Sequence, residues 1–331
     1  MAQPFSVAVC IPTFNQGGYV VAAVESALQQ IGVETEVWIS DDASTDVTAA
    51  ALEKFSRNPL VHIHRQNANT GIAFNASWVM SRPRTDYVVR LDSDDLLRPD
   101  YCRNLAGLLE SNPKAAVAHC AVQEIDSKGA RGRVRRLARK SGFQSAEEAL
   151  RSAATGYRVA ANICMFRKEA LDSLPFVFQE GLNFCEDWDL FARLAAAGWG
   201  NAYSSSVLAE YRVWKDAAGL RELRRAAEIA GIKHVIGSTL SDAWSRKGWP
   251  LTQLESARVR FACVQSACLL NLDPESPEYL RLRQNLEALA GNKIKLVDEY
   301  LEKIRDLRHL RVMQDWLHLR LRDLWKAVFY R

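Results

Sequence analysis

Short apolar segments alternate with helix-like segments along the first ninety residues of the chain. The apolar segments end in turn residues, as buried strands do, and they are Phe5–Ile11, Glu36–Ser40, Val61–His64 and Tyr87–Leu91. Between them, apolar residues spaced three and four apart predict helices over about 19–29, after 41–46 and over 73–80. Because strands alternating with helices form parallel βαβ units, we predict an α/β fold with a mostly parallel sheet and flanking helices.

Beyond about residue 220 the pattern is helical throughout. Apolar spacing predicts helices over 221–244, 251–272, 278–289 and 293–331. We therefore predict two domains, an α/β domain over 1–220 and an α-helical C-terminal domain over 221–331. A chain of 331 residues is long enough for both.

The cysteines and the apolar stretches favour a cytoplasmic protein. Seven cysteines lie mostly in apolar surroundings, without a C-x-x-C pair or metal-ligand spacing, which is typical of reduced thiols. No signal peptide precedes Phe5, and no apolar stretch is long enough to span a bilayer.

Polar turns follow three of the predicted strands, over 12–18, 41–46 and 92–95. Ligands of such sheets bind beyond the carboxyl ends of the strands, so we expect these turns to line one crevice. Asp92 and Asp94 alternate along an extended segment and should project to the same side. Mg²⁺ or Mn²⁺ would relieve their repulsion and share its coordination with substrate phosphates. The alternative is an Asp-rich turn without a ligand.

The same crevice lacks the usual phosphate-binding motifs. There is no G-x-G-x-x-G after the first strand and no G-x-x-x-x-G-K-[ST] in the chain. A nucleotide in an acidic site needs a metal, and Asp92 with Asp94 would supply its ligands. Asp41 or Asp42 can accept an N–H from a base edge, although 41–46 is also a normal capped helix start.

Five motifs in order carry a resemblance to a known family. They are Ile11–Asn15, Ser40–Asp46, Asn69–Gly71, Leu91–Asp95 and Glu186–Leu190. Over roughly its first two-thirds the chain resembles the inverting family 2 glycosyltransferases of the GT-A fold, which use nucleoside-diphosphate sugars. Each motif is weak alone, but the ordered set is specific.

The resemblance implies a role for each matching residue. The donor would be a UDP- or dTDP-sugar, because Asp41 or Asp42 could bind the imide edge that uracil and thymine share. The nucleotide would be held by Pro12, Thr13, Asn15, Asp41, Asp42, Asn69 and Gly71. Asp92, Ser93 and Asp94 would contact the ribose and the diphosphate, with Asp92 and Asp94 as ligands of Mn²⁺ or Mg²⁺. Asp187 would be the base that deprotonates the acceptor hydroxyl. The expected acceptor or loop contacts are Glu186, Trp188, Arg212 and Trp214.

The chemistry agrees with these residue types. A general base activates the acceptor hydroxyl, a metal neutralises the leaving diphosphate, and direct attack inverts the anomeric centre. Glu186 beside Asp187 should raise the pKa of one of the two. The alternative is an acidic helix start stabilised by the helix dipole. Trp214 replaces a histidine of many relatives and either stacks on a sugar or packs against the following helix.

Cationic residues gather in a segment predicted to be a polar loop, namely Lys128, Arg131, Arg133, Arg135, Arg136, Arg139 and Lys140. The loop either is simply solvated or clamps an anionic acceptor, such as a lipid-linked diphosphate. No aromatic residues interleave these charges, so nucleic acid is not an expected partner. The net charge of the chain is only +4.

Residues 305–331 form a basic amphipathic pattern that ends in Trp325, Phe329 and Tyr330. Such a helix can lie in a membrane interface, on the inner face of the cytoplasmic membrane, or pack on a neighbouring helix or a second subunit of a homo-oligomer. We expect sugar transfer to a saccharide or lipid-linked saccharide in surface polysaccharide assembly. Two alternatives are a sugar-phosphate nucleotidyltransferase, which normally has a basic Gly-rich first loop, and a non-catalytic subunit that binds a nucleotide sugar.

Overall fold

The computed structural model describes residues 5–156, 163–214 and 217–306. The chain divides into two compact units between Leu254 and Glu255. This division differs from the predicted one after residue 220, because the helices that follow residue 220 pack on the α/β unit. Thr239, for example, donates a hydrogen bond of 2.5 Å to Asp189, which lies in the helix Glu186–Ala196 of the α/β unit.

The first unit is built on one ten-stranded sheet with the order β3-β2-β1-β4-β9-β6-β10-β5, and β7 and β8 pair with β6 and β10. Strands β1 to β4 pair in parallel as predicted. The whole sheet is mixed, because β9 runs antiparallel to both β4 and β6. The strands are β1 (Ser6–Thr13), β2 (Glu34–Asp41), β3 (Val61–Arg65), β4 (Tyr87–Leu91), β5 (Leu96–Leu97), β6 (Ala115–Ile125), β7 (Arg131–Arg135), β8 (Gly142–Gln144), β9 (Ile163–Arg167) and β10 (Gly200–Arg212).

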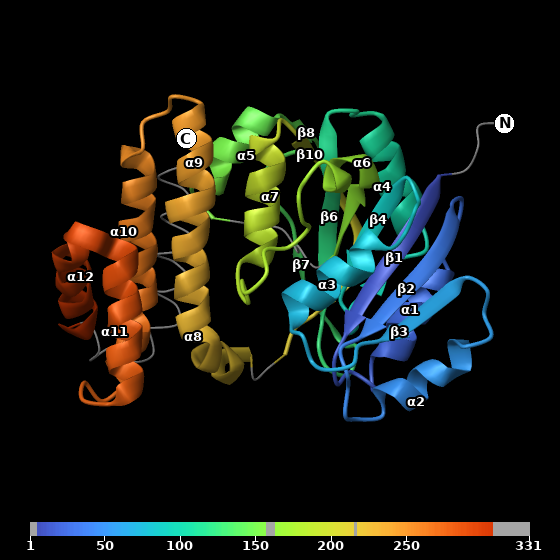
Figure 1. Ribbon diagram of the computed structural model, residues 1–331, viewed down its shortest axis with the longest axis horizontal. Coiled ribbons are helices and arrows are strands. Elements are labelled where there is room, and N and C mark those ends of the chain that lie inside the picture. Colours follow the sequence, from blue (N-terminus) through green and yellow to red (C-terminus); the bar gives the residue numbers. More distant parts are fainter. Residues whose placement is uncertain (1–4, 157–162, 215–216, 307–331) are drawn as a thin grey trace. The chain divides into compact units, whose positions relative to one another are not determined.

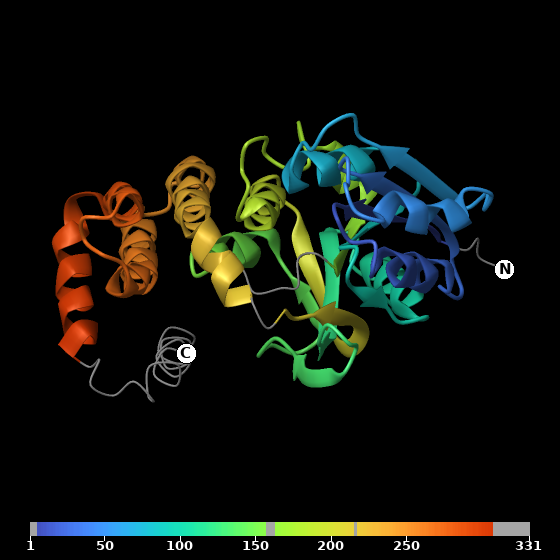
Figure 2. The same cartoon turned by 90° about the horizontal axis from the view of Figure 1, so that it is seen from below.

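Helices cover both faces of this sheet (Figures 1 and 2). In the first unit they are α1 (Val20–Leu28), α2 (Thr48–Leu52), α3 (Ile72–Ser81), α4 (Tyr101–Glu110), α5 (Ala146–Ala153), α6 (Lys168–Asp172), α7 (Glu186–Ala196), α8 (Ala217–His234) and α9 (Ser241–Arg246). A π-helical segment, Val235–Leu240, joins α8 to α9.

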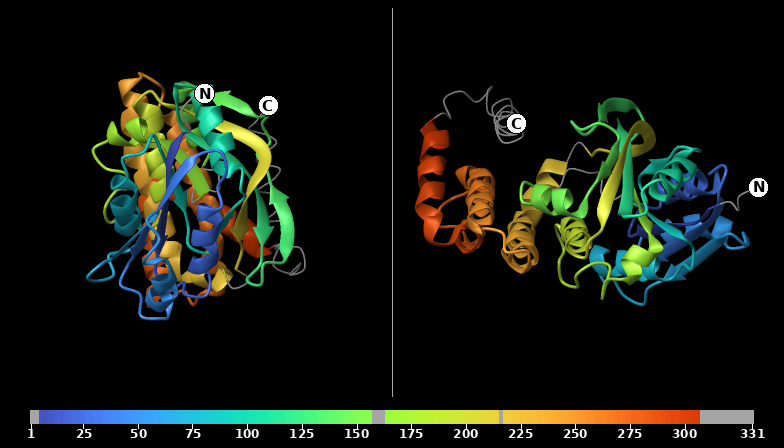
Figure 3. Two further views of the ribbon diagram at one scale, coloured as in Figure 1. Left: turned by 90° about the vertical axis from the view of Figure 1, so that its right-hand side faces the viewer. Right: turned by 90° about the horizontal axis from the view of Figure 1, so that it is seen from above.

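Two apolar layers hold the sheet between its helices. On one face, α1, α2 and α4 pack on Val9, Ile11 and Val89. On the other face, α3, α6 and α7 pack on Ala8, Cys10 and Val88. Figure 3 shows α4 and α3 on opposite sides of the strands. Because β1 and β4 are covered on both sides, their side chains are buried in succession, and this explains the unbroken apolar runs in the sequence.

The second unit is helical, as predicted for the C-terminal part. It contains most of α10 (Thr252–Ser266), then α11 (Pro277–Ala290) and α12 (Ile294–Asp306). Arg283 of α11 forms an ion pair with Asp298 of α12, and Arg258 of α10 donates to the carbonyl of Leu289 at 2.9 Å. The amphipathic pattern predicted for 305–331 lies almost wholly outside the described residues.

Three further predictions can be compared with the structure. The segment predicted as a polar loop contains a strand, β7, because Arg131–Arg135 pairs with β6. All seven cysteines are free thiols, as expected. Within the described residues, no helix combines the length and the apolar character that crossing a membrane requires.

Candidate active site

The carboxyl ends of β1, β2 and β4 lie at one edge of the sheet, because the three strands are parallel neighbours. The turns that follow β1 and β2 contain residues in the left-handed region of backbone conformation. In the described part of the chain, the non-glycine residues with a positive φ are Asn15, Ala43 and Cys185, with φ values of 53°, 58° and 64°. All three belong to turns singled out by the sequence motifs or adjoin one. Such strain is typical of functional sites, where the surrounding structure holds it in place.

Asn15 fastens the turn after β1 to the turn after β2. Its backbone N–H donates to Ser44 Oγ at 2.9 Å, and its side-chain Oδ1 accepts the N–H of Thr45 at 2.8 Å. Thr13 ends β1 and is 3% exposed, and its hydroxyl has no hydrogen-bond partner among the described residues. A buried hydroxyl without a partner beside two polar turns is a position where a ligand atom would be favourable.

Asp41 and Asp42 are buried, and both carboxylates serve the architecture of the turns. Asp41 accepts the N–H of Ser44 at 2.9 Å and forms an ion pair with Arg65 at 3.2 Å. Asp42 accepts three hydrogen bonds, two from Thr70 at 2.8 and 2.7 Å and one from the N–H of Gly71 at 2.9 Å. Each oxygen therefore has at most one lone pair left for a nucleotide base.

The other predicted nucleotide residues lie on the same edge. Asn69 donates to the carbonyl of Asp42 at 3.4 Å, and Gly71 precedes α3 with a φ of 85° that favours glycine. Pro12 is buried within the end of β1. Asn75, which the sequence left unassigned, is buried and donates to the carbonyl of Ser40 at 2.8 Å, so it is a structural residue.

The acidic segment Asp92–Asp95 forms a turn after β4, where a polar turn was predicted, but its backbone is not extended as the predicted alternation of Asp92 and Asp94 requires. The N–H of Asp95 donates to the carbonyl of Asp92 at 3.0 Å, which closes the turn around the buried Ser93. The alternation argument therefore does not apply, although the carboxyl groups still lie close enough to interact. Burial and the charge of Asp92 raise the pKa of Asp94.

Two residues from the end of β10 hold this turn. The backbone N–H of Arg212 donates to Asp95 Oδ1 at 2.7 Å, and its side-chain Nε donates to the carbonyl of Asp94 at 2.8 Å. Trp214 Nε1 donates to Asp94 Oδ2 at 2.8 Å, and its ring meets Tyr19 edge-on with 5.2 Å between centroids. Tyr19 precedes α1, so the first turn and the acidic turn meet through this indole. Arg212 is 7% exposed and acts here as a support of the turn.

Asp187 reaches the same edge from the first turn of α7. Its Oδ1 accepts the N–H of Trp188 at 2.7 Å. Burial, then the charge of Glu186, raises the pKa of Asp187 to about 6, and Arg90 limits the rise. A carboxyl with this pKa is a usable proton acceptor near neutral pH.

Arg90 links the two acidic groups, and the sequence analysis did not assign it a role. Its Nε donates to Asp92 at 3.1 Å and its Nη1 lies 3.5 Å from Glu186. Burial alone would lower the pKa of Arg90, but Asp92, Glu186 and Asp187 raise it. The sequence did contain a sign of this role, because Arg90 lies inside the otherwise apolar run Tyr87–Leu91 and a buried guanidinium needs carboxylate partners.

Trp188 does not fit the predicted contact with an acceptor. It is 4% exposed, and its Nε1 donates to the carbonyl of Ala153 at 3.1 Å. This places the indole between α5 and α7, where it packs the helices together. Trp188 is therefore a core residue of α7, the helix that also carries Asp187.

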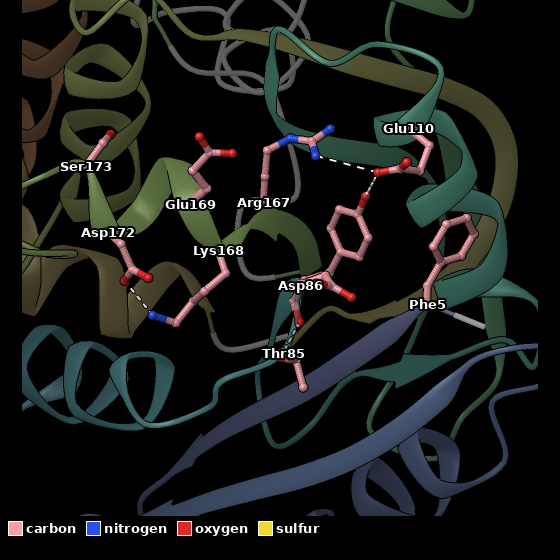
Figure 4. A pocket seen from close by; sticks show the side chains of 10 residues that line it. Phe5, Thr85, Asp86, Glu110, Arg167, Lys168, Glu169, Asp172 and Ser173 are labelled. Carbon is pink, nitrogen blue, oxygen red and sulfur yellow. Dashed lines mark hydrogen bonds and ion pairs between the residues drawn. The ribbon is translucent and has the colours of Figure 1, made fainter. Parts of the chain in front are cut away.

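A concave pocket of about 830 Å³ lies at the opposite end of β1 and β4 (Figure 4). Its polar groups pair with one another: Tyr87 donates to Glu110, Arg167 lies 3.6 Å from Glu110, and Lys168 pairs with Asp172. Because these charges are already compensated and the acidic turn is at the other end of the strands, this pocket is not the candidate active site.

The acidic turn is suited to a metal whose coordination is completed by phosphate oxygens. No group of three or more His, Cys, Asp or Glu side chains that could hold a metal occurs in the described residues. Asp92 and Asp94 supply two carboxylates, and a cation would offset the charge of Asp92, which after burial raises the pKa of Asp94. A divalent ion that takes one or two carboxylates plus substrate phosphates needs no more than this.

Solved structures with the same architecture define the fold as GT-A type, which confirms the prediction. S. aureus TarS 1-349 superposes with a TM-score of 0.58 at 17% identity, covering 91% of each chain. The mannosyltransferase PcManGT from Pyrobaculum calidifontis has a TM-score of 0.56 at 17% identity, covering 88% of each chain.

Sequence comparison identifies the family. The family model for glycosyl transferase family 2 matches residues 8–174, and the chain belongs to this family. Chondroitin synthase of Escherichia coli is 30% identical over 196 residues, which cover 58% of this chain and 27% of that protein. The succinoglycan biosynthesis protein ExoO of Rhizobium meliloti is 31% identical over 207 residues, covering 58% and 56%. The chain thus spans between about a quarter and just over half of the length of these two relatives.

Proposed function

We propose that this chain transfers a sugar from a nucleoside-diphosphate sugar to a hydroxyl group of a saccharide acceptor, with inversion and with the help of a divalent cation. The observation that carries the proposal is the link through Arg90. The buried guanidinium of Arg90 lies within 3.5 Å of both Asp92 and Glu186, which are far apart in the sequence, and Asp187 is the residue that follows Glu186. We infer that Asp92 belongs to the site for the leaving diphosphate and that Asp187, whose pKa is raised to about 6, is the base.

Each group would have a distinct task. The turns after β1 and β2, joined through Asn15 and Ser44, would hold the nucleoside. Asp92 and Asp94 would hold Mn²⁺ or Mg²⁺, which supplies charge neutralisation for the leaving diphosphate. Asp187 would accept the proton of the acceptor hydroxyl. Because the hydroxyl attacks the anomeric carbon directly, the transfer needs no enzyme nucleophile and inverts that centre.

The neighbours agree with a nucleotide-sugar donor. S. aureus TarS 1-349 has been solved with UDP and with UDP-GlcNAc, and PcManGT with GDP-Man and Mn²⁺. The relatives are named for chondroitin synthesis and succinoglycan biosynthesis, so we propose polysaccharide assembly as the process. We keep UDP- or dTDP-sugars as the first donors to test, with a saccharide or lipid-linked saccharide as acceptor.

Calorimetry with UDP, dTDP, GDP and CDP, with and without Mn²⁺, tests the donor site. We expect one nucleotide to bind the wild type more tightly with Mn²⁺, and this gain to vanish in Asp94→Ala. Asp100→Ala is a matched control, because Asp100 precedes α4 and is not part of the acidic turn. A folded wild type that binds none of the four nucleotides would contradict the proposal.

The two alternatives make different predictions in the next step. A nucleotidyltransferase would release pyrophosphate from a nucleoside triphosphate and a sugar phosphate. A non-catalytic subunit would bind the nucleotide without turnover of its sugar derivative. Release of nucleoside diphosphate that depends on an added acceptor supports the transferase, and the anomeric coupling constant of the product by NMR tests the inversion.

A further inference from the structure

The cationic segment after β6 is an ordered hairpin. Asp126 Oδ1 accepts the N–H groups of Lys128 and Ala130 at 2.8 and 2.9 Å, which fixes the turn between β6 and β7. Side chains alternate along a strand, so Arg131, Arg133 and Arg135 project from the same face of β7 at steps of about 7 Å. We call these three side chains the arginine row.

The arginine row has more donors than its own carboxylates use. Glu124 Oε1 accepts from the Nε atoms of both Arg133, at 2.9 Å, and Arg135, while Arg131 lies 3.4 Å from Glu210. The terminal Nη atoms of Arg133 and Arg135 make no hydrogen bond to any residue within the described ranges. These side chains are 66% and 41% exposed, so their guanidinium ends face solvent.

The lowered pKa of Glu124 shows that the arginine row favours negatively charged groups. Burial opposes the ionisation of Glu124, but hydrogen bonds from Arg135 and Arg133 outweigh it and lower the pKa of the carboxyl group. A guanidinium binds carboxylate and phosphate oxygens through paired N–H groups. The row therefore already stabilises one carboxylate and has open N–H groups for others.

The arginine row lies beside the acidic turn. The guanidinium of Arg135 is 4.5 Å from the ring centre of Tyr211, and the pKa of that phenol is raised by burial and then by the charge of Asp95. The carbonyl of Asp126, at the start of the hairpin turn, accepts a hydrogen bond from Arg212, the same side chain that supports Asp94. A saccharide that reaches the reaction centre from this side would pass over the hairpin.

We propose that the arginine row binds the carboxylate or phosphate groups of an anionic saccharide acceptor. This inference rests on the proposed function and names the acceptor class. Three guanidinium groups in regular steps match charges that repeat along a polymer. A membrane surface fits less well, because no large apolar side chain of residues 126–140 is exposed. The donor diphosphate is assigned to the acidic turn.

Calorimetry on the full chain tests the proposal with three probes: hexagalacturonate for carboxylates, inorganic triphosphate for phosphates and maltohexaose as a neutral saccharide. We expect at least one anionic probe to bind and maltohexaose not to bind. The anionic affinity should fall about tenfold or more in R133Q/R135Q, because this variant loses the charge-assisted hydrogen bonds of two guanidinium groups. The affinity for the nucleotide with Mn²⁺ should be unchanged.

Two further variants control for folding and for overall charge. R133Q/R135Q/E124Q removes the half-buried carboxylate that the double variant leaves without partners, so it should fold and show the same loss. R57Q/R103Q removes two exposed charges from elsewhere in the first unit and should bind like the wild type.

Each contrary result has a definite meaning. The inference fails if neither anionic probe binds, if the charge control loses as much affinity as the hairpin variants, or if the hairpin variants lose nucleotide affinity, which would assign the row to the donor. It also fails if R133Q/R135Q loses binding to vesicles of anionic phospholipid and retains the oligosaccharide. Absence of nucleotide binding to the wild type refutes the transferase proposal itself, whereas nucleotide binding without probe binding refutes the acceptor class alone.

Discussion

Replacing Asp187 by asparagine tests the assignment of the base, because it removes one ionisable group and keeps its shape. The hydrogen bond from the N–H of Trp188, 2.7 Å long, can be accepted equally by an amide oxygen. In the wild type, burial and the charge of Glu186 raise the pKa of Asp187 from 3.8 to about 6. The side chain can therefore accept a proton above about pH 6 and not below it.

The expected loss of activity follows from this role. A positioned general base contributes about 10²- to 10⁴-fold, so the kcat of Asp187→Asn at pH 8 should fall by about that factor. The affinity for the nucleotide should stay within about twofold, since the donor turns belong to other elements. In the wild type, kcat/KM should fall about tenfold per pH unit below about pH 6, and this acid limb should be absent from the variant.

Stability should change in the opposite direction. A carboxyl whose pKa is raised on folding stabilises the folded state in its protonated form, and this contribution is lost as the pH rises through the folded pKa. The rise from 3.8 to about 6 corresponds to at most about 3 kcal/mol, at 1.36 kcal/mol per pH unit. Asp187→Asn should thus need more urea to unfold at pH 8, with a smaller difference towards pH 4.

The assay is release of nucleoside diphosphate in the presence of acceptor, measured from pH 5 to pH 9 with urea unfolding at the same pH values. Glu186→Gln is the matched control, because it removes the neighbouring charge that raises the pKa of Asp187. Its acid limb should move to lower pH while its plateau stays above that of Asp187→Asn. A variant Asp187→Asn with the wild-type plateau and the wild-type acid limb would refute the assignment.

Two other substitutions test the framework of the site. Trp214→Phe removes the 2.8 Å hydrogen bond to Asp94 and should weaken Mn²⁺ binding about 10- to 100-fold. Electron paramagnetic resonance with the nucleotide present measures this affinity, and an affinity equal to that of the wild type would contradict a positioning role. Asp42→Ala removes the acceptor of three hydrogen bonds from Thr70 and Gly71, so urea unfolding should show a free energy of unfolding lower by about 2–4 kcal/mol. A loss below about 0.5 kcal/mol would show that the turn does not depend on Asp42.

The strands that carry the donor turns were predictable because each is covered on both faces. Val7, Val9 and Ile11 face one apolar layer, while Ala8 and Cys10 face the other, so the whole of β1 reads as apolar. Parallel neighbours then put their carboxyl ends together, and the predicted meeting of the turns after β1 and β2 is seen in the bonds of Asn15. Local pattern and topology gave the same answer here.

The errors came from features that depend on contacts distant in the sequence. Residues 131–135 have little apolar character, because their strand pairs with β6 at the surface and exposes its arginines. The predicted alternation of Asp92 and Asp94 is wrong because hydrogen bonds from Arg212, which is distant in the sequence, hold these residues in a turn. The limit of the first unit depends on packing after residue 220, which a change in composition does not reveal.

Arg90 makes the donor turn and the base electrostatically dependent on each other. It is 4% exposed and faces Asp92, Glu186 and Asp187, so its charge opposes the rise in the pKa of Asp187 that burial and Glu186 cause. Arg90→Met should therefore move the acid limb of kcat/KM above pH 6. It should also lower the melting temperature, because it leaves the partly buried carboxylates of Asp92 and Glu186 without their partner. Arg90→Lys keeps the positive charge and should leave the limb near pH 6, although the ammonium group lacks the planar fork of N–H donors that links Arg90 to Asp92 and Glu186. An acid limb that stays at the same pH in Arg90→Met would show that Arg90 does not contribute to the pKa of the base, and the coupling between the two halves of the site would then have to be abandoned.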